Sequence, residues 1–245
     1  MAMTEYHPPT DPWINIVFED EHLLVANKPP GLLSVPGKRE EHYDSLWSRL
    51  VADFPDIQVV HRLDMSTSGL MLFAKNKSAE RTLKKQFQYR LTHKIYYARV
   101  WGNIENDKGE IDLPLICDWP NRPKQKVCFE HGKPSKTLYQ VVEREDKCCV
   151  VRLLPITGRS HQLRVHMQAL GNPIVGDEFY AGEEALAFSE RLQLHAAELS
   201  FYHPETEKLS NVFAECEFYP AAKAQIFQHF DAAPMLPDYK KLPRP

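Results

Sequence analysis

A short polar turn between two apolar runs constrains the fold of this chain more than any other feature. The run from His61 to Leu70 places one carboxylate, Asp64, among small hydroxylated residues that end at Gly69. Residues 59–60 are β-branched and residues 70–74 are apolar, so we predict a strand on each side of the turn. Loops held between strands often carry reactive groups. An aspartate can also cap such a turn by accepting backbone N–H bonds, and the turn alone favours that simpler interpretation.

Four short segments follow one another in an order and spacing that chance matches do not preserve. They are Asn27-Lys28-Pro29-Pro30-Gly31-Leu32, His61-Arg62-Leu63-Asp64 with Thr67-Ser68-Gly69, Lys94-Ile95-Tyr96-Tyr97-Ala98, and Gly158-Arg159-Ser160-His161-Gln162-Leu163-Arg164-Val165-His166. Together they resemble the signature of the RluA family of pseudouridine synthases. Within that family, the short chain and residues 117–124 resemble the bacterial member that modifies a large-subunit ribosomal RNA and transfer RNAs.

The resemblance implies an α+β fold, the pseudouridine synthase catalytic core, with a long bent mixed sheet, mostly antiparallel, flanking helices and a central cleft. Strand-like and helix-like segments do not alternate regularly along the chain, which disfavours a doubly wound parallel sheet. We predict a catalytic domain over residues 1–218, without the small N-terminal S4-like domain of many members. A C-terminal extension over residues 219–245 is expected to include an amphipathic stretch at 226–230 and a mobile end.

Periodicity, capping and turn signals give a coarse outline of the secondary structure. Strands are predicted at residues 14–18, 23–26, 59–62, 70–74, 95–101, 137–142, 149–154, 192–201 and 211–217. Helices are predicted at 45–54 after a cap at Asp44, at 79–90 after a cap at Ser78, and at 160–170.

Composition is that of an ordinary globular protein, with 245 residues, 43% hydrophobic and 26% charged. No apolar run is long enough to cross a membrane, and no leader pattern is present. The five cysteines are odd in number and lack Cys-x-x-Cys spacing, so we expect free thiols in a reducing cytoplasm. The sequence gives no strong reason to expect an oligomer, and a monomer is the default expectation.

The net charge of −3 argues against nucleic-acid binding, but a global count can hide a local patch. Residues 120–136 hold five basic residues, Lys124 and Lys126 among them, and a single acidic one. Residues 81–90 hold four basic residues and no acidic residue. A single such run is usually a solvated face. Two in a chain with these motifs favour a basic groove that contacts RNA phosphates.

The resemblance implies that the chain isomerises uridine to pseudouridine in structured RNA. This reaction breaks the ribose–N1 bond, turns the base and rejoins it through C5, without redox change or loss of a group, so no cofactor and no metal is expected. Asp64 is the predicted catalytic carboxylate, acting by covalent attack or by stabilising charge at the anomeric carbon. Arg164 is the predicted partner that keeps the Asp64 carboxylate ionised and oriented. The alternative interpretation is that Arg164 is an ordinary surface arginine.

The family match also places an active-site tyrosine at Tyr96, where it would stack on the target base and assist proton removal at C5. Strand alternation puts Tyr96 and Tyr97 on opposite faces, so only one of them can face a cleft, and Tyr96 is the one that the family match selects. Arg62 is expected to fill the space that the flipped uridine leaves, or to hold a phosphate. His61 is expected to support the loop through hydrogen bonds.

Arg159 and His161 complete the set of expected RNA-binding residues. A metal site at His161 and His166 is disfavoured because the two lie five residues apart, and structural hydrogen bonding is preferred for both. A kinase-like catalytic loop is excluded, because Leu63 intervenes between Arg62 and Asp64 and the sequence has no glycine-rich phosphate loop.

Two functions therefore remain. The first is an RNA-modifying isomerase whose targets are a transfer-RNA anticodon stem-loop and a hairpin of 23S ribosomal RNA. The second is a catalytically inactive protein on the same fold that binds RNA or assists its folding. Asp64, Tyr96 and Arg164 together favour the enzyme, because a pure binder has no use for a carboxylate facing a polyanion.

Overall fold

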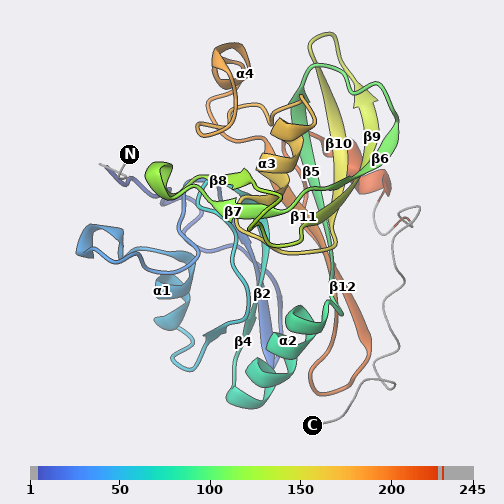
Figure 1. Ribbon diagram of the computed structural model, residues 1–245. Helices are drawn as coiled ribbons and strands as arrows, with labels where there is room; N and C mark the ends of the chain where they lie inside the picture. The colour runs from blue at the N-terminus through green and yellow to red at the C-terminus, as the bar shows by residue number, and fades with distance from the viewer. Residues whose placement is uncertain (1–4, 226–227, 229–245) are drawn as a thin grey trace. The chain divides into compact units, whose positions relative to one another are not determined.

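The computed structural model describes residues 5–225 and residue 228 (Figure 1). The chain divides into two compact units. The first unit holds residues 6–94 and 196–215, and the second holds residues 95–195 and 216–223. Two strands, β5 (His93–Trp101) and β11 (Leu194–Tyr202), begin in one unit and end in the other.

The first unit is built on a sheet with the strand order β1-β2-β4-β11, to which β3 and β12 add at β4 and β11. The bounds are β1 (Ile16–Glu19), β2 (Leu23–Lys28), β3 (Gln58–Val59), β4 (Ser68–Ala74) and β12 (Leu209–Phe213). The pairs β1–β2, β2–β4, β3–β4 and β11–β12 are antiparallel. Every residue of β4 is buried, as expected for a strand covered on both faces.

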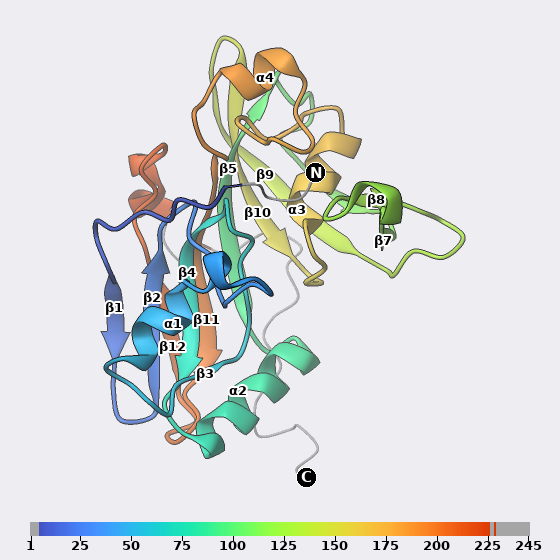
Figure 2. The same cartoon turned by 90° about the vertical axis from the view of Figure 1, so that its left-hand side faces the viewer.

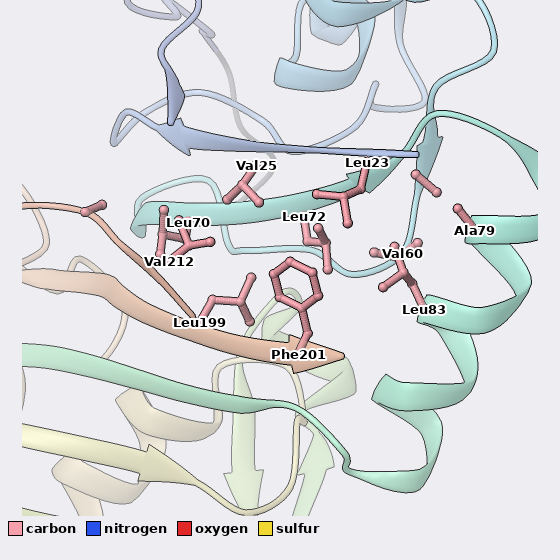
Figure 3. Close-up of a cluster of buried hydrophobic side chains, with 12 residues drawn as sticks. Leu23, Val25, Val60, Leu70, Leu72, Ala79, Leu83, Leu199, Phe201 and Val212 are labelled. Carbon is pink, nitrogen blue, oxygen red and sulfur yellow. The ribbon is translucent and has the colours of Figure 1, made fainter. Parts of the chain in front are cut away.

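The core of the first unit joins this sheet to helix α2 (Lys77–Tyr89). In Figure 3 the side chains of Leu72, Phe201 and Leu83 point toward one another from β4, β11 and α2. Helix α1 (Leu46–Val51) and the short 3₁₀ helix η1 (Glu40–His42) complete the unit. The buried Ala79 and Leu83 lie four residues apart, on one face of α2, which is the periodicity that predicts this helix.

Both helix caps of the first unit differ from the sequence prediction by one or two residues. Ser45, and not Asp44, caps α1 by accepting a hydrogen bond from the N–H of Ser48. Asn76, and not Ser78, caps α2 through the N–H of Ala79. Asp44 instead accepts two hydrogen bonds from the buried guanidinium of Arg49, so its carboxylate is occupied by an ion pair.

The second unit has the antiparallel strand order β5-β10-β9-β6 and a separate antiparallel hairpin of β7 and β8. Its remaining elements are β6 (Lys108–Asp112), β7 (Leu115–Cys117), β8 (Gln125–Val127), β9 (Lys136–Arg144), β10 (Cys148–Pro155), α3 (Gln162–Ala169), α4 (Glu183–Ala187), and the 3₁₀ helices η2 (Trp119–Asn121) and η3 (Pro220–Gln225). Figure 2 shows β7 and β8 beside α3.

The α+β class and the mostly antiparallel pairing are confirmed, but several element boundaries differ from the prediction. The strand predicted at 211–217 is Leu209–Phe213, and the helix predicted at 45–54 is Leu46–Val51. The strand predicted at 59–62 is only Gln58–Val59, because His61 turns into the Asp64 loop. The helix predicted from Ser160 begins at Gln162, after His161 adopts a left-handed φ of 53°. The predicted amphipathic stretch at 226–230 and the C-terminal end lie outside the described residues, apart from residue 228. None of the described helices has the length and apolarity that a bilayer crossing requires.

Candidate active site

Asp64 lies half-buried in an irregular loop that leads directly into β4. The N–H of Thr67 donates to the backbone carbonyl of Asp64 at 3.1 Å and closes the turn. Thr67 and Ser68 are buried, and Gly69 adopts a φ of +117° where β4 begins. The loop is therefore held by its own backbone and by the strand that follows, as the sequence predicts for a rigid reactive turn.

The loop that follows β2 holds the backbone on both sides of Asp64. The hydroxyl of Ser34, itself buried, donates to the carbonyl of Leu63 at 2.6 Å and accepts from the N–H of Leu63 at 3.1 Å. The N–H of Gly31 donates to the carbonyl of Met65 at 2.9 Å. The residues before and after Asp64 are thus fixed by partners about 30 positions away in the sequence.

Lys28 is a fully buried lysine beneath this loop. Its Nζ donates to the carbonyls of Pro29 and Leu32, both at 2.8 Å, and of Met65 at 2.9 Å. All three N–H groups of an ammonium are thereby satisfied. Burial lowers the pKa of Lys28 to about 7, while the negative charge of Asp64 acts to raise it. Lys28 therefore lies within electrostatic reach of the predicted catalytic carboxylate.

Lys28 belongs to the first of the four sequence motifs, but no role was predicted for it. The signal was a charged residue at the end of the buried strand Leu23–Lys28, where a lysine needs partners for its charge. Ser34 gave no comparable signal, because an isolated serine in a loop is ordinary.

His61 supports the loop, as predicted. Its Nε2 accepts a hydrogen bond from the N–H of Leu72 at 2.9 Å, and its ring stacks on Phe87 with centroids 4.5 Å apart. Desolvation lowers the pKa of His61 to about 3, and the charge of Lys94 acts in the same direction. The imidazole is therefore neutral at physiological pH. Arg62 is exposed, and none of the described residues forms an ion pair with it.

Arg164 lies on α3 in the second unit and is 2% exposed, so the surface-arginine alternative is wrong. Its Nε and Nη2 donate to the two carboxylate oxygens of Asp177 at 2.7 and 2.6 Å. The rings of Phe179 and Tyr180 lie 5.1 and 5.2 Å from the guanidinium carbon. The two hydrogen bonds to Asp177 and the two aromatic rings fix the orientation of the planar guanidinium. A lysine ammonium could not make the same paired and stacked contacts.

Asp177 was not identified from the sequence. Besides pairing with Arg164, its Oδ1 accepts from the N–H groups of Phe179 and Tyr180 at 3.0 and 3.3 Å. An acidic residue after a glycine carries no distinctive pattern, so only its position in the fold identifies it.

The histidines of the same segment have structural partners. His161 Nδ1 lies 2.7 Å from the hydroxyl of Tyr180. The buried His166 lies between the hydroxyl of Thr137 at 2.9 Å and the carbonyl of Leu113 at 3.1 Å. In the described part of the chain, histidine, cysteine and carboxylate side chains form no group of three that could hold a metal. Arg159 is exposed, and its Nε lies 3.4 Å from the carbonyl of Pro134.

The two tyrosines of β5 differ in their surroundings. Tyr97 is fully buried and packs on Tyr219 with centroids 5.4 Å apart, and Tyr96 is 8% exposed. Because neighbouring residues of a strand face opposite sides, Tyr97 belongs to the core of the second unit. Both side chains are buried, so the choice of Tyr96 over Tyr97 stays a prediction.

Lys124 directly precedes β8, and Lys126 lies within it. Lys126 pairs with Asp118 at 3.1 Å while its side chain stays 55% exposed. Lys28, His61, Arg62 and Asp64 thus belong to the first unit, and Tyr96, Lys124, Lys126, Arg159, His161 and Arg164 to the second. The catalytic pairing of Asp64 with Arg164 stays a prediction.

Comparisons with known proteins decide the family. Residues 22–169 match the family described as RNA pseudouridylate synthase, and these residues include the whole Asp64 loop, Tyr96 and Arg164. The chain belongs to the RNA pseudouridylate synthase family. The inactive alternative is not favoured, because the curated members that it matches are named as synthases.

Three members of the RNA pseudouridylate synthase family illustrate the similarity. "Dual-specificity RNA pseudouridine synthase RluA" of Vibrio parahaemolyticus is 72% identical over the full length of both chains. The protein of the same name from Escherichia coli K12 is 58% identical over 83% of this chain and 94% of its own. The solved structure of human RNA Pseudouridylate Synthase Domain Containing 1 has a TM-score of 0.73 at 30% identity, covering 89% of this chain and 91% of that one.

Proposed function

We propose that this protein is an RNA pseudouridine synthase, an isomerase that acts on uridine in both a transfer RNA and the large-subunit ribosomal RNA. The observation that carries the proposal is the identity of 72% along the whole chain to a protein named as a dual-specificity synthase. The held position of Asp64 in the first unit supports it independently, because a fixed carboxylate is the one reactive group that the chemistry requires.

Asp64 is the proposed nucleophile, or the anion that stabilises positive charge at the anomeric carbon when the ribose–N1 bond breaks. The freed uracil turns, its C5 forms the new bond to the ribose, C5 loses a proton and N1 gains one, so the product is an isomer of the substrate. Bonds to Leu63 and Met65 on either side of the carboxylate reduce the reorganisation needed to reach the sugar.

The second unit supplies the remaining proposed roles. Arg164, oriented by Asp177, is proposed to hold the carboxylate ionised. Tyr96 is proposed to stack on the uracil and to assist removal of the C5 proton. Neither residue needs a cofactor for these tasks.

Arg62 is the proposed residue for base flipping. It is exposed two positions before Asp64, so its guanidinium is free to enter the space left by the extruded uridine or to hold a phosphate. Lys124, Lys126, Arg159 and His161 are proposed RNA contacts that position the stem-loop through its backbone.

The proposed substrates are a transfer-RNA anticodon stem-loop and a hairpin of 23S ribosomal RNA. We propose that the protein acts on them as a monomer in the cytoplasm, and the five cysteines, none in a disulfide, accord with a reducing compartment. Light scattering on the purified protein, alone and with RNA, measures the oligomeric state.

The test compares Asp64→Asn with the wild type on both transcribed RNAs, by measuring pseudouridine formation and RNA affinity separately. We expect the variant to lose isomerisation by at least about 10³-fold while it still binds RNA, because Asn keeps the shape of Asp but cannot attack or carry charge. Asp53→Asn, which changes an exposed carboxylate of the same unit, is the matched control. A wild type that makes no pseudouridine in either RNA would leave the RNA-binding alternative.

A further inference from the structure

The surface that carries the inference is an arm of the second unit, formed by residues 115–133. It contains β7, η2 and β8, and both Figure 1 and Figure 2 show β7 and β8 next to α3. At η2 the arm exposes Trp119, which is 65% accessible to solvent. One exposed aromatic residue is ordinary in a globular protein. The surroundings of Trp119 distinguish it.

A guanidinium is stacked on the indole of Trp119. The central carbon of Arg122 lies 4.4 Å from the ring centroid, and Arg122 is itself exposed. The contact holds the indole in one orientation and places a positive charge beside it. An aromatic ring next to an exposed cation is the combination that binds an unpaired nucleotide, because the base stacks while the cation attracts the phosphate.

The charges near Trp119 also suit a polyanion. Asp118, the neighbouring acid, is neutralised by Lys126 at 3.1 Å and accepts from the side-chain amide of Asn121 at 2.8 Å. Lys124 and the exposed Lys133 add further positive charge to the arm. A surface of this sign attracts phosphate groups rather than an acidic protein.

The arm is fixed to the helix that carries Arg164. Leu115 and Val127 pack on Val165 of α3 and on Tyr180. The hydroxyl of Tyr180 accepts from the N–H of Gln125 at 2.8 Å and lies 2.7 Å from Nδ1 of His161. Trp119 therefore projects from an anchored platform rather than from a free loop, which lowers the entropy cost of stacking.

We propose that Trp119, braced by Arg122, is a stacking platform for an unpaired nucleotide of the substrate RNA other than the reacting uridine. This inference rests on the proposed function, and it assigns Trp119 a role that the resemblance over residues 117–124 does not specify. The platform reads no base by hydrogen bonds, so it suits a protein that accepts loops from two different RNAs.

Phe129 provides a matched comparison on the same arm. It is 78% exposed, yet it stands beside Glu130, whose carboxylate is 82% exposed and repels phosphates. Trp119 and Phe129 thus share exposure and aromatic character and differ in the sign of the neighbouring charge. The platform hypothesis assigns RNA binding to Trp119 alone.

The experiment measures kcat, KM and affinity of the full chain for a transcript that the wild type modifies. We expect Trp119→Ala to raise KM and the dissociation constant about tenfold with little change in kcat, whereas Trp119→Phe keeps most of the affinity. Arg122→Lys, which keeps the charge but loses the flat stack, should weaken binding by a smaller factor. Phe129→Ala should match the wild type. The chain has four tryptophans, and RNA stacked on Trp119 should quench part of their fluorescence. Trp119→Phe should lose that part of the quenching.

The outcomes separate the two proposals. Three results would overturn the platform while the wild type still makes pseudouridine. They are an unchanged KM in Trp119→Ala, equal losses of RNA affinity in Trp119→Ala and Trp119→Phe, and a loss of affinity in Phe129→Ala as large as that in Trp119→Ala. Absence of pseudouridine from the wild-type reaction would instead overturn the proposed function. Because Trp119 and Arg122 are both exposed, circular dichroism of the variants is expected to match the wild type.

Discussion

His61 shows how a single residue can keep a reactive loop in place without taking part in proton transfer. Its Nε2 is occupied by the N–H of Leu72, its ring lies on Phe87, and burial holds its pKa near 3. A protonated ring would have to give up the bond from Leu72, since both nitrogens of an imidazolium are donors. The fold therefore depends on His61 being neutral.

This dependence predicts how stability varies with pH. The pKa of His61 is about 3 in the folded chain and about 6.5 in the unfolded chain, so between these values the unfolded state binds more protons. The free energy of unfolding should therefore fall as the pH drops from 6.5 to 5, with His61 contributing on the order of 1–2 kcal/mol. Urea titrations at several pH values should show a shallower fall in His61→Gln.

The control for this measurement is His131→Gln, which changes a histidine whose side chain is 69% exposed. Its pH profile should follow that of the wild type. Parallel profiles for wild type and His61→Gln would contradict the neutral state of His61.

At the scale of elements, the start of β4 depends on close contact with the neighbouring strand β11. A Cβ on Gly69 would overlap the backbone N and O atoms of Ala196, and the φ of +117° at Gly69 is one that other residues rarely adopt. The sequence indicated only that a glycine ends the turn. The need for glycine comes from the approach of β11, which lies more than 120 positions away in the chain.

We predict that Gly69→Ala lowers the free energy of unfolding by at least about 2 kcal/mol, since both the backbone strain and the overlap oppose the native state. Thermal and urea unfolding measure the loss. Gly182→Ala is the control, because Gly182 has an ordinary φ of −75° and a Cβ there meets no atom within 4 Å. A Gly69→Ala variant as stable as Gly182→Ala would show that β11 can move away from β4.

The elements themselves were largely predictable, and their ends were not. Helix α2 follows from the spacing of Leu83 and its neighbours, and β9 and β10 follow from a charged turn between two apolar runs. The caps were wrong because Asp44 and Ser78 are as good as Ser45 and Asn76 by residue type. Only the ion pair from Arg49, which comes from α1 itself, explains why Asp44 is not the cap.

At the scale of the whole molecule, the predicted site residues divide between two units, with Asp64 in one and Tyr96 and Arg164 in the other. Each unit prepares its own part of the chemistry, since Lys28 and Ser34 hold the carboxylate loop and Asp177 orients the arginine. RNA recognition of this kind uses loop shape and unstacked bases more than sequence, which makes two unrelated targets compatible with one surface.

A cellular experiment tests the molecule as a whole. Cells that lack the gene should lose pseudouridine at one or more uridines of a transfer-RNA anticodon stem-loop and of a large-subunit ribosomal RNA hairpin. The wild-type gene should restore both sets of sites, and Asp64→Asn should restore neither, as measured by pseudouridine mapping. Restoration in a single RNA class would contradict the proposed dual specificity.

By itself, the sequence determined the family, the reactive turn and the order of most elements, because these depend on residue type and short-range spacing. Tertiary structure decided which groups surround the reactive ones. Lys28 and Ser34 bind the Asp64 loop across 37 and 29 positions of sequence, and Asp177 binds Arg164 from another segment. Hydrogen bonds and charges act through space, so the protonation of His61 and the holding of Asp64 follow only once the chain has folded.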